Sequence, residues 1–526
     1  MLSWVAFAPL IVAILRARPA GALEIEGSAN LQAAKPGQAF LLAYASGILW
    51  YAGTCYWIYD TMHEHGGLSA PAALLALFLF CLYLGLYHGL FGLLLSLAVG
   101  LGRDDRRALL ATPFLWVTVE LARTRVTGFP WNLLGTAQVD NISLSRITTW
   151  TGVYGVSFEI MLVNVAVAAA FLVPRKKRNT LLMASFAAAA VLQAGRLVDA
   201  PALATDHAAL LVQENIAVDT NWTRNTFEQA LRELSDLSVK DVATGSSVSG
   251  SVVSESAPAL SAEQSKMDLI VWPESPAPFF TNDPLFRDPM SRMARETHSW
   301  VVTGAIGSTP AKSGGNSQGF NSAALVSPAG EWTARYDKVH LVPFGEYLPF
   351  PRLFAFAGGL TKEVGEFGTG ESRAPLDAGD TRLGVFICYE SVFPDEVRQF
   401  ANNGAQVLVN LSNDGWYGDS GAYAQHLNQT RMRAIENGRW LLSATNTGVT
   451  ASIDPYGRTV ERLLRKQRAA LVAHYALTSV TTFYTRHGDW FAGLCAIISI
   501  WALLTRFVWP KNSGIRKFGN KAESSS

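Results

Sequence analysis

The sequence predicts an α/β domain inserted into a polytopic α-helical membrane domain. Three observations lead to this fold class. Hydrophobic residues make up 49% of the 526 residues and charged residues only 16%, far from the average for soluble proteins. Long uncharged runs occupy much of the first 197 residues and recur near the C-terminus. Residues 198–489 instead alternate short apolar runs with helix-like polar stretches, which is typical of a sheet covered by helices.

Seven apolar runs are candidates for membrane-spanning helices. Residues 2–15 have no Lys or Arg before them, which indicates a membrane helix, or the remnant of one, rather than a signal peptide. Residues 39–58 carry no charge and residues 71–102 carry only His88, so both runs are long enough to span a bilayer. The remaining candidates are residues 108–122, 150–173, 179–197 and 490–505.

Basic residues mark every second connection between these runs. Because Lys and Arg in short loops stay on the cytoplasmic side, we expect the start of the chain and the large polar region outside. We therefore predict a membrane domain of about six helices over residues 1–197, an extracytoplasmic domain over 198–489, and a final helix with a cytoplasmic tail over 490–526. The basic clusters are Arg16 and Arg18; Arg103, Arg106 and Arg107; residues 175–178; and Arg506, Lys511, Arg516 and Lys517.

Short apolar runs predict the strands of the polar region. Residues 243–266 interrupt the pattern, since they are rich in Ser, Ala and Val with almost no large apolar side chain. We interpret them as a flexible surface insertion without chemistry. The expected strands are residues 208–212, 269–272, 300–306, 323–327, 383–387, 407–410 and 469–475.

The strand over residues 383–387 delivers Cys388 at its tip, followed at once by polar groups. A thiol in this position is a candidate nucleophile, although a free cysteine can also be a small buried hydrophobic residue. The other cysteines, Cys55, Cys81 and Cys495, fall in apolar runs, so neither a disulfide framework nor a cysteine-based zinc site is expected.

Two other segments carry ionisable groups that a cysteine nucleophile needs. Glu274 follows the strand over residues 269–272, where a partly desolvated carboxylate would accept the thiol proton. It could instead be a solvated acid or a helix cap. Lys338 lies in an aromatic and apolar segment, where its ammonium would favour a thiolate and stabilise an oxyanion. It could equally be a surface charge.

Aromatic residues gather in two loop-like segments. Residues 343–360 contain Phe344 and Tyr347 among several Pro and Gly, and Phe279, Phe280 and Phe286 follow Glu274. We expect such loops to rest in the outer leaflet as a lid over the thiol. The alternative is that they pack inward as core.

Composition and motifs also exclude several classes of partner. The net charge of +1 provides no concentrated basic face for nucleic acid. No His, Cys or Asp cluster has metal-ligand spacing and no Gly-rich phosphate loop follows a strand, so we expect no cofactor. A transporter with a ligand-binding module would need more ionisable residues within the spans than Glu120, His88 and Glu159.

The order of these motifs resembles a known family. Glu in WPES (272–275), Lys in YDKVHLVPFGEYLP (336–349) and Cys in CYES (388–391) are similar to the Glu-Lys-Cys triad of the nitrilase, or carbon-nitrogen hydrolase, superfamily. Within it, the chain resembles the apolipoprotein N-acyltransferase family, a nitrilase-like α-β-β-α sandwich set between membrane spans. Further similar segments are TGFPWN (127–132), GVYGVSF (152–158), NDGWYG (413–418) and YTRHGDW (484–490).

The resemblance implies a role for each matching residue. Cys388 is the nucleophile, Glu274 the general base and Lys338 the support for the tetrahedral intermediate. Further essential acids and residues lining the site are then Glu346, Glu390, Tyr389, Asn321, Trp222 and Trp416.

The implied reaction has two substrates. A phospholipid, typically phosphatidylethanolamine, donates an acyl chain to the thiol, and the thioester passes it to the α-amino group of the diacylglyceryl-cysteine of an apolipoprotein. The implied location is the bacterial inner membrane, with the catalytic domain on the periplasmic side. An alternative enzyme is a membrane-tethered amidase acting on small soluble amides.

The chain departs from this family in three respects. Family members have eight spans with both termini inside, whereas this chain offers seven with its start outside, as expected if the first helix is missing or the start codon is placed late. Glu214 stands where the family usually has Gly, and the insertion lengthens the segment between Trp222 and Glu274. The changes at Glu214 and in the insertion leave the triad intact.

Overall fold

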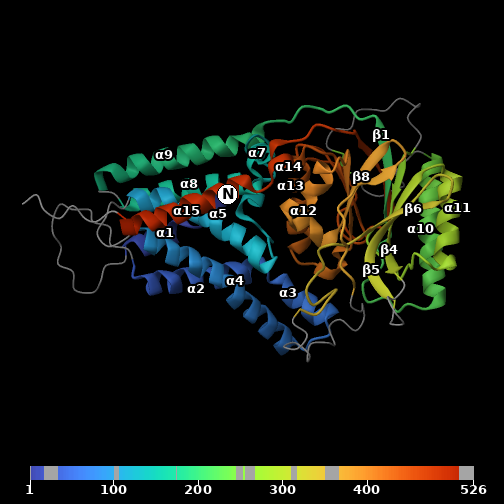
Figure 1. Ribbon diagram of the computed structural model, residues 1–526, viewed down its shortest axis with the longest axis horizontal. Coiled ribbons are helices and arrows are strands. Elements are labelled where there is room, and N and C mark those ends of the chain that lie inside the picture. The colour runs from blue at the N-terminus through green and yellow to red at the C-terminus, as the bar shows by residue number, and fades with distance from the viewer. Residues whose placement is uncertain are drawn as a thin grey trace, which may run out of the picture.

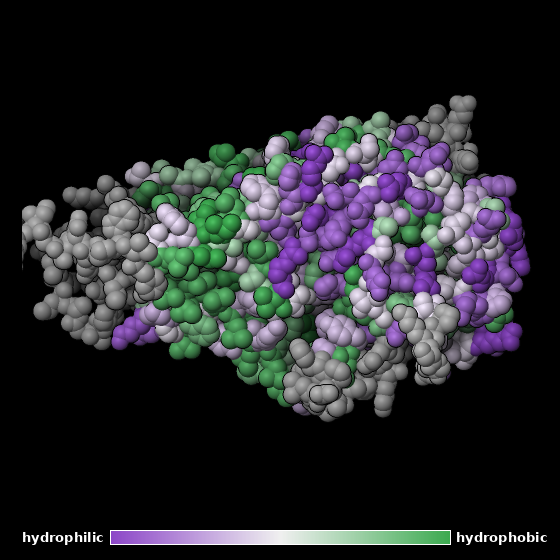
Figure 2. Space-filling model, viewed as in Figure 1, coloured by the Kyte–Doolittle hydropathy of each residue, from purple (hydrophilic) through white to green (hydrophobic). Residues whose placement is uncertain are grey.

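Two parts with unlike surfaces make up the molecule. In the computed structural model, helices form an elongated bundle at one end and a two-sheet sandwich forms the other (Figure 1). Apolar residues cover much of the bundle and hydrophilic residues cover much of the sandwich (Figure 2). The predicted fold class, an α/β domain inserted into a helical membrane-type domain, is therefore confirmed. The structure describes residues 2–16, 34–99, 106–172, 175–244, 253–254, 267–275, 277–309, 317–349 and 367–508.

A helix lies at each of the seven predicted apolar runs. Three stretches, Ala70–Val99, Val153–Leu172 and Arg178–Leu197, are long and apolar enough to cross a membrane, and Leu2–Leu15 and Trp490–Thr505 are shorter apolar stretches. Many leucines of the bundle are exposed, which suits contact with lipid tails. The helices are α1 (Ala8–Arg16), α2 (Pro36–Thr54), α4 (Ala70–Val99), α5 (Arg106–Ala122), α8 (Val153–Leu172), α9 (Arg175–Gln193) and α15 (Trp490–Val508).

The helices of the bundle alternately approach and leave the sandwich. α2 ends at the sandwich, where the Thr54 carbonyl accepts a hydrogen bond from Gln425, and α8 begins there, where the Val153 amide donates to Glu436. Short helices precede α1 and fill the connections at this end. They are η1 (Leu2–Trp4), α3 (Trp57–Asp60), η2 (Thr61–His65), η3 (Arg123–Thr127), η4 (Leu134–Gln138), α6 (Ile142–Ser145), α7 (Thr148–Thr151) and η5 (Ala194–Leu197). α1 ends, and α9 begins, at the opposite end of the bundle (Figure 1), and the sequence has Arg16 and Arg178 at or near these helix ends.

Two mixed sheets pack face to face and enclose a large buried apolar cluster. In spatial order the first sheet is β13 (Ala469–Tyr475), β1 (His207–Gln213), β3 (Leu269–Val271), β4 (Trp300–Thr309), β5 (Gln318–Val326) and β6 (Trp332–Asp337). The second is β2 (Val253–Ser254), β12 (Thr459–Arg462), β11 (Ala451–Ile453), β10 (Leu441–Thr445), β9 (Val407–Ser412), β8 (Thr381–Ile387) and β7 (Leu376–Ala378).

Helices cover both outer faces of the sandwich (Figure 1). α10 (Arg224–Thr244) and α11 (Pro284–Thr297) cover the first sheet, while α12 (Pro394–Asn402) and α13 (Ala422–Asn437) lie between the second sheet and the bundle. α11 begins at Pro284 because the Asp283 side chain accepts a hydrogen bond from the Leu285 amide. α14 (Phe483–His487) leads the chain back toward the bundle.

The aromatic residues after Glu274 do not form a membrane-facing lid. Phe279 and Phe286 are fully buried, stack with ring centroids 4.5 Å apart, and belong to the core between the first sheet and α10 and α11. That expectation was wrong for these two rings, because they fill the helix–sheet interface farthest from the bundle. Phe280 is 42% exposed. Residues 350–360 of the other aromatic segment lie outside the described residues.

Each of the seven predicted strands is present, but six further strands were not predicted. One of them, β2, comes from the predicted flexible insertion and pairs with β12 at the edge of the second sheet. Most of residues 243–266 lie outside the described part of the chain. The other strands not predicted are β6, β7, β10, β11 and β12.

Gly304 on β4 allows the segment after β3 to pack against the sheet. A Cβ atom at this position would lie 2.3 Å from the Pro273 carbonyl oxygen and 2.8 Å from the Glu274 Cα. The backbone that carries Glu274 therefore approaches β4 more closely than any side chain at position 304 permits.

Gly304→Ala should displace this segment and lower the free energy of unfolding by about 1–3 kcal/mol, because overpacking forces the backbone apart. Thermal unfolding of the purified protein measures the change. Gly319→Ala on β5 is the control, since its nearest neighbour would lie 3.7 Å away. Equal transition midpoints for the two variants would contradict this account.

Candidate active site

Cys388 sits in a sharp turn directly after β8. Its φ is +49°, a left-handed conformation that is uncommon outside glycine, and its side chain is buried. Glu390 holds this turn. One of its oxygens accepts from the Ile387 amide at 2.7 Å, and the other accepts from the Tyr336 hydroxyl at 2.7 Å and the Val339 amide at 2.8 Å. Glu390 thus ties the cysteine turn to the segment that follows β6.

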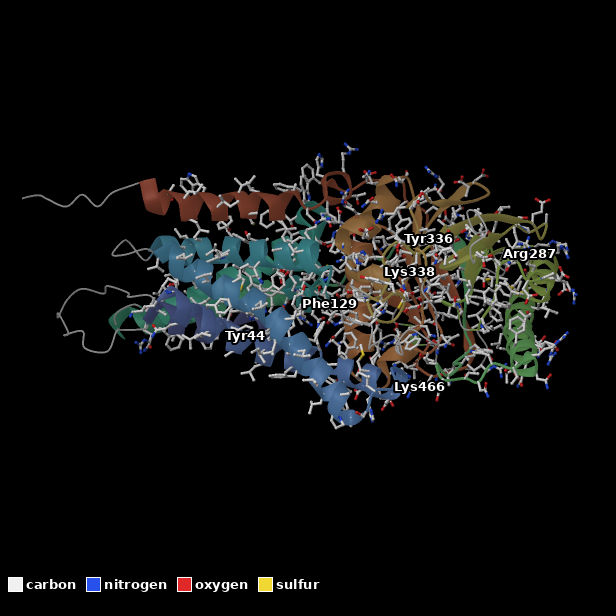
Figure 3. The ribbon with its side chains drawn as sticks, turned by 60° about the horizontal axis from the view of Figure 1, so that its bottom comes forward. Tyr44, Phe129, Arg287, Tyr336, Lys338 and Lys466 are labelled. Carbon is white, nitrogen blue, oxygen red and sulfur yellow. The ribbon has the colours of Figure 1, made fainter. Side chains whose placement is uncertain are left out.

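A buried ionic cluster gathers three of the predicted residues around Lys338. The Lys338 ammonium lies 2.9 Å from Glu346 Oε1 and 3.3 Å from Glu274 Oε1. The Asn321 amide nitrogen donates to the same two oxygens, at 2.6 Å and 2.8 Å. The second Glu274 oxygen accepts a hydrogen bond from the backbone N–H of Asn413, directly after β9 of the other sheet, at 2.9 Å. In Figure 3, Lys338 lies inside the sandwich, whereas Arg287 lies toward the end away from the helices.

The charges of this cluster act on the thiol in opposite directions. Burial raises the pKa of Cys388 well above its usual value, the Glu274 carboxylate raises it further, and the Lys338 ammonium lowers it. Burial alone would lower the pKa of Lys338, but Glu346 and Glu274 outweigh it and raise that pKa. The resting thiol is therefore neutral beside a lysine that is charged, and it needs a base to become a nucleophile.

Three predicted aromatic residues occupy different places. The Tyr389 hydroxyl donates to the Gly128 carbonyl of the bundle at 3.2 Å. Trp416 belongs to η8 (Asp414–Tyr417), and its carbonyl accepts from Thr61 of η2 at 2.9 Å. Trp222 packs against the cluster beneath α10 and α11, so the structure does not bring it into the ionic cluster.

His426 and Asp414 form a pair behind Cys388 that the sequence analysis did not find. His426 Nε2 lies 3.1 Å from the Cys388 carbonyl oxygen, and Nδ1 lies 3.0 Å from Asp414 Oδ1. Nε2 also lies 2.8 Å from the Ser391 hydroxyl, so the ring contacts Asp414 on one side and both Ser391 and the Cys388 carbonyl on the other. Burial lowers the pKa of His426, but Asp414 and the Cys388 carbonyl raise it above its usual value. On α13, His426 looked like an ordinary helix residue, and only the long-range contact reveals it.

The cysteine side of the sandwich rests directly on the bundle. The Trp131 indole donates to Gln425 of α13 at 2.6 Å. Arg125 pairs with Asp395 at 3.0 Å and with Asp489 at 2.6 Å. Over the ranges that the structure describes, no group of three or more His, Cys, Asp and Glu side chains could hold a metal ion.

Comparison with known proteins finds a matching family for each of the two parts of the chain. The carbon-nitrogen hydrolase family matches residues 189–484, so the sandwich with its Glu, Lys and Cys cluster is a carbon-nitrogen hydrolase domain. The apolipoprotein N-acyltransferase N-terminal domain matches residues 1–166. The chain belongs to the apolipoprotein N-acyltransferase family, whose members are transferases within this superfamily.

Relatives match over nearly the whole chain. The apolipoprotein N-acyltransferase of Geobacter metallireducens is 34% identical over 94% of this chain and 88% of its own length. That of Azotobacter vinelandii is 32% identical over 91% and 89%. Among solved structures, an amidase from Nesterenkonia sp. is 19% identical, with a TM-score of 0.36, over 54% of this chain and 93% of its own.

Glu274→Gln should lower the pKa of the Cys388 thiol, because it removes the carboxylate that raises it and leaves the Lys338 charge less compensated. The rate of alkylation of Cys388 by a small reagent, followed by peptide mass spectrometry across pH, measures this pKa. Glu296→Gln on α11 is the control and should leave the profile unchanged. A higher pKa in Glu274→Gln would contradict the electrostatic account.

The raised pKa of His426 predicts a pH-dependent contribution to stability. Because protonated His426 is favoured in the folded state, this contribution is fully present below the unfolded value of about 6.5 and is lost as pH rises through the folded value. The unfolding midpoint of the wild-type protein should therefore fall as pH rises through the folded pKa of His426. In His426→Asn this fall should be smaller. His298→Asn, at an exposed position, should leave the slope unchanged. An unchanged slope in His426→Asn would contradict the prediction.

Proposed function

We propose that Cys388, Glu274 and Lys338 catalyse a two-step transfer of an acyl chain from a phospholipid to an apolipoprotein. The donor is proposed to be phosphatidylethanolamine, and the acceptor is the α-amino group of an N-terminal diacylglyceryl-cysteine. The observation that carries the proposal is the buried Glu274–Lys338 pair, whose two charges both act on a thiol beside the helical bundle. Family membership supports a lipoprotein substrate.

In the first step, Glu274 takes the proton of the Cys388 thiol as the sulfur attacks an ester carbonyl of the phospholipid. The Lys338 ammonium stabilises the oxyanion of the tetrahedral intermediate. The ester C–O bond then breaks, and the proton on Glu274 passes to the leaving glycerol oxygen. The products are a thioester on Cys388 and a lysophospholipid.

In the second step, the neutral α-amino group attacks the thioester carbonyl. The C–S bond breaks, an amide forms, and the amine proton returns through Glu274 to the thiolate. Glu346 and Asn321 position the two charged partners, and Glu390 positions the cysteine turn. The proposed contacts with substrate are Tyr389, Trp222 and Trp416.

We further propose that the bundle lies in the bacterial inner membrane with the sandwich on the periplasmic side. The alternating helix directions support this orientation, because α1 ends at Arg16, and α9 begins close to Arg178, at the end of the bundle away from the sandwich. Basic residues at membrane ends favour the cytoplasmic side.

Incubation with phosphatidylethanolamine alone should add an acyl chain to Cys388, because the first step needs no acceptor. Peptide mass spectrometry locates the adduct, and hydroxylamine should remove it as expected of a thioester. Cys388→Ser should remain folded, transfer no acyl chain to a diacylglyceryl peptide, and show no hydroxylamine-sensitive adduct. A folded wild-type protein that stays unmodified, but hydrolyses small amides, would overturn the proposal in favour of a membrane-tethered amidase.

A further inference from the structure

A cleft of about 590 Å³ lies where the helical bundle meets the sandwich, separate from the buried ionic cluster. Its bundle wall is the connection between α2 and α4, which contributes Asp60 and Glu64. Its sandwich wall includes Gly415, Arg465 and Lys466. Figure 3 shows Lys466 at the edge of the sandwich beside the α2–α4 connection.

The bundle wall of the cleft is acidic. Neither Asp60 nor Glu64 forms a salt bridge with any residue that the structure describes. The Glu64 carboxylate repels that of Asp60. Partial burial and this repulsion together raise the pKa of Asp60. A cation between them would relieve this repulsion.

The sandwich wall presents donors for an anion. Arg465 stacks on Tyr423 with its guanidinium carbon 3.8 Å from the ring centroid, and its Nε–H has no partner in the described part of the chain. Within the described residues, Lys466 pairs with the highly exposed Asp419 at 2.7 Å. Arg465 lies 3.5 Å from the same carboxylate and also donates to the Gly418 carbonyl. Thr447 lines the same cleft and is 7% exposed, yet its hydroxyl also lacks a partner among the described residues. Buried donors of this kind usually have an acceptor.

The cleft lies at the depth expected for lipid head groups. The segment that carries Asp60 joins the sandwich ends of two bundle helices, the level at which a bilayer changes from tails to polar groups. Gly415 in the opposite wall comes two residues after Asn413, whose amide holds Glu274. A molecule bound in the cleft therefore lies beside the loop that positions the proposed base.

We propose that this cleft binds the head group of the acyl-donor lipid, a group that carries both a phosphate and a primary ammonium. The ammonium lies against Asp60 and Glu64, and the phosphate lies against Arg465, Lys466 and Thr447. This inference rests on the proposed function, since it assigns a place to the first substrate. It makes the cleft a determinant of donor specificity without a part in the chemistry.

The test measures initial rates of Cys388 acylation in the full-length protein with phosphatidylethanolamine or phosphatidylglycerol, which lacks the ammonium. The double variant Asp60→Asn, Glu64→Gln should raise the half-saturating concentration of phosphatidylethanolamine by roughly three- to tenfold, and leave that of phosphatidylglycerol and both maximal acylation rates unchanged. Lys466→Asn should raise the half-saturating concentration of both lipids, because both carry the phosphate. Asp288→Asn on α11 is the control.

A second measurement separates the lipid head group from a simple anion. Glycerophosphoethanolamine should inhibit acylation by phosphatidylethanolamine, and inorganic phosphate at the same concentration should not. Equal inhibition by both, or equal losses with both lipids in the double variant, would overturn the proposal. The proposal is also overturned if the wild-type protein is acylated and the cleft variants are acylated with the same kinetics. If no lipid acylates the wild-type protein, the proposed function itself fails, and the head-group site fails with it.

Discussion

The structure of the site depends on one buried charge, the Lys338 ammonium. Such a charge is tolerated in an interior only when carboxylates and hydrogen bonds compensate it, and here Glu274 and Glu346 do so. The first of these carboxylates also accepts the Asn413 amide, so the same compensation joins one sheet to the other. Removing both acids would leave the Lys338 charge unpaired in the core. The contacts that compensate the Lys338 charge therefore also fix the position of Glu274 between the two sheets. Asn321 on β5 donates to it from one sheet, and Asn413, directly after β9, donates from the other.

The loop that begins at Asn413 connects the Glu274 site to the helical bundle. Its Trp416 carbonyl accepts from Thr61, and the Gly421 amide donates to the Tyr56 hydroxyl, both on the connection between α2 and α4. The residue that holds Glu274 is thus anchored to the bundle. Because α12 and α13 also rest on the bundle, the sandwich and the helices form a continuous packed body rather than two parts joined by a linker.

The parts of the fold that the sequence predicted are those with a strong local signal. Apolar runs located the bundle helices and seven strands, and polar residues at strand ends singled out Cys388 and Glu274. β6 was missed because its alternating polar residues lie half-buried at a sheet edge. The Phe279 and Phe286 rings were assigned to the membrane because composition cannot distinguish a lipid-facing surface from a helix–sheet interface. His426 carries no local signal, since its role comes from a contact with a residue 38 positions away.

The burial of Cys388 suits transfer to an amine better than hydrolysis. A thiol kept neutral by burial is unreactive until an acyl donor is in place, so the site is protected from oxidation and from side reactions. The same burial limits the access of water to a thioester formed there. An amine delivered by a lipid-anchored substrate then meets little competition from water, even though water is far more abundant. Placing the cysteine turn against the bundle, with Tyr389 bonded to Gly128, would therefore favour aminolysis through exclusion of solvent rather than through any change in the Glu-Lys-Cys chemistry.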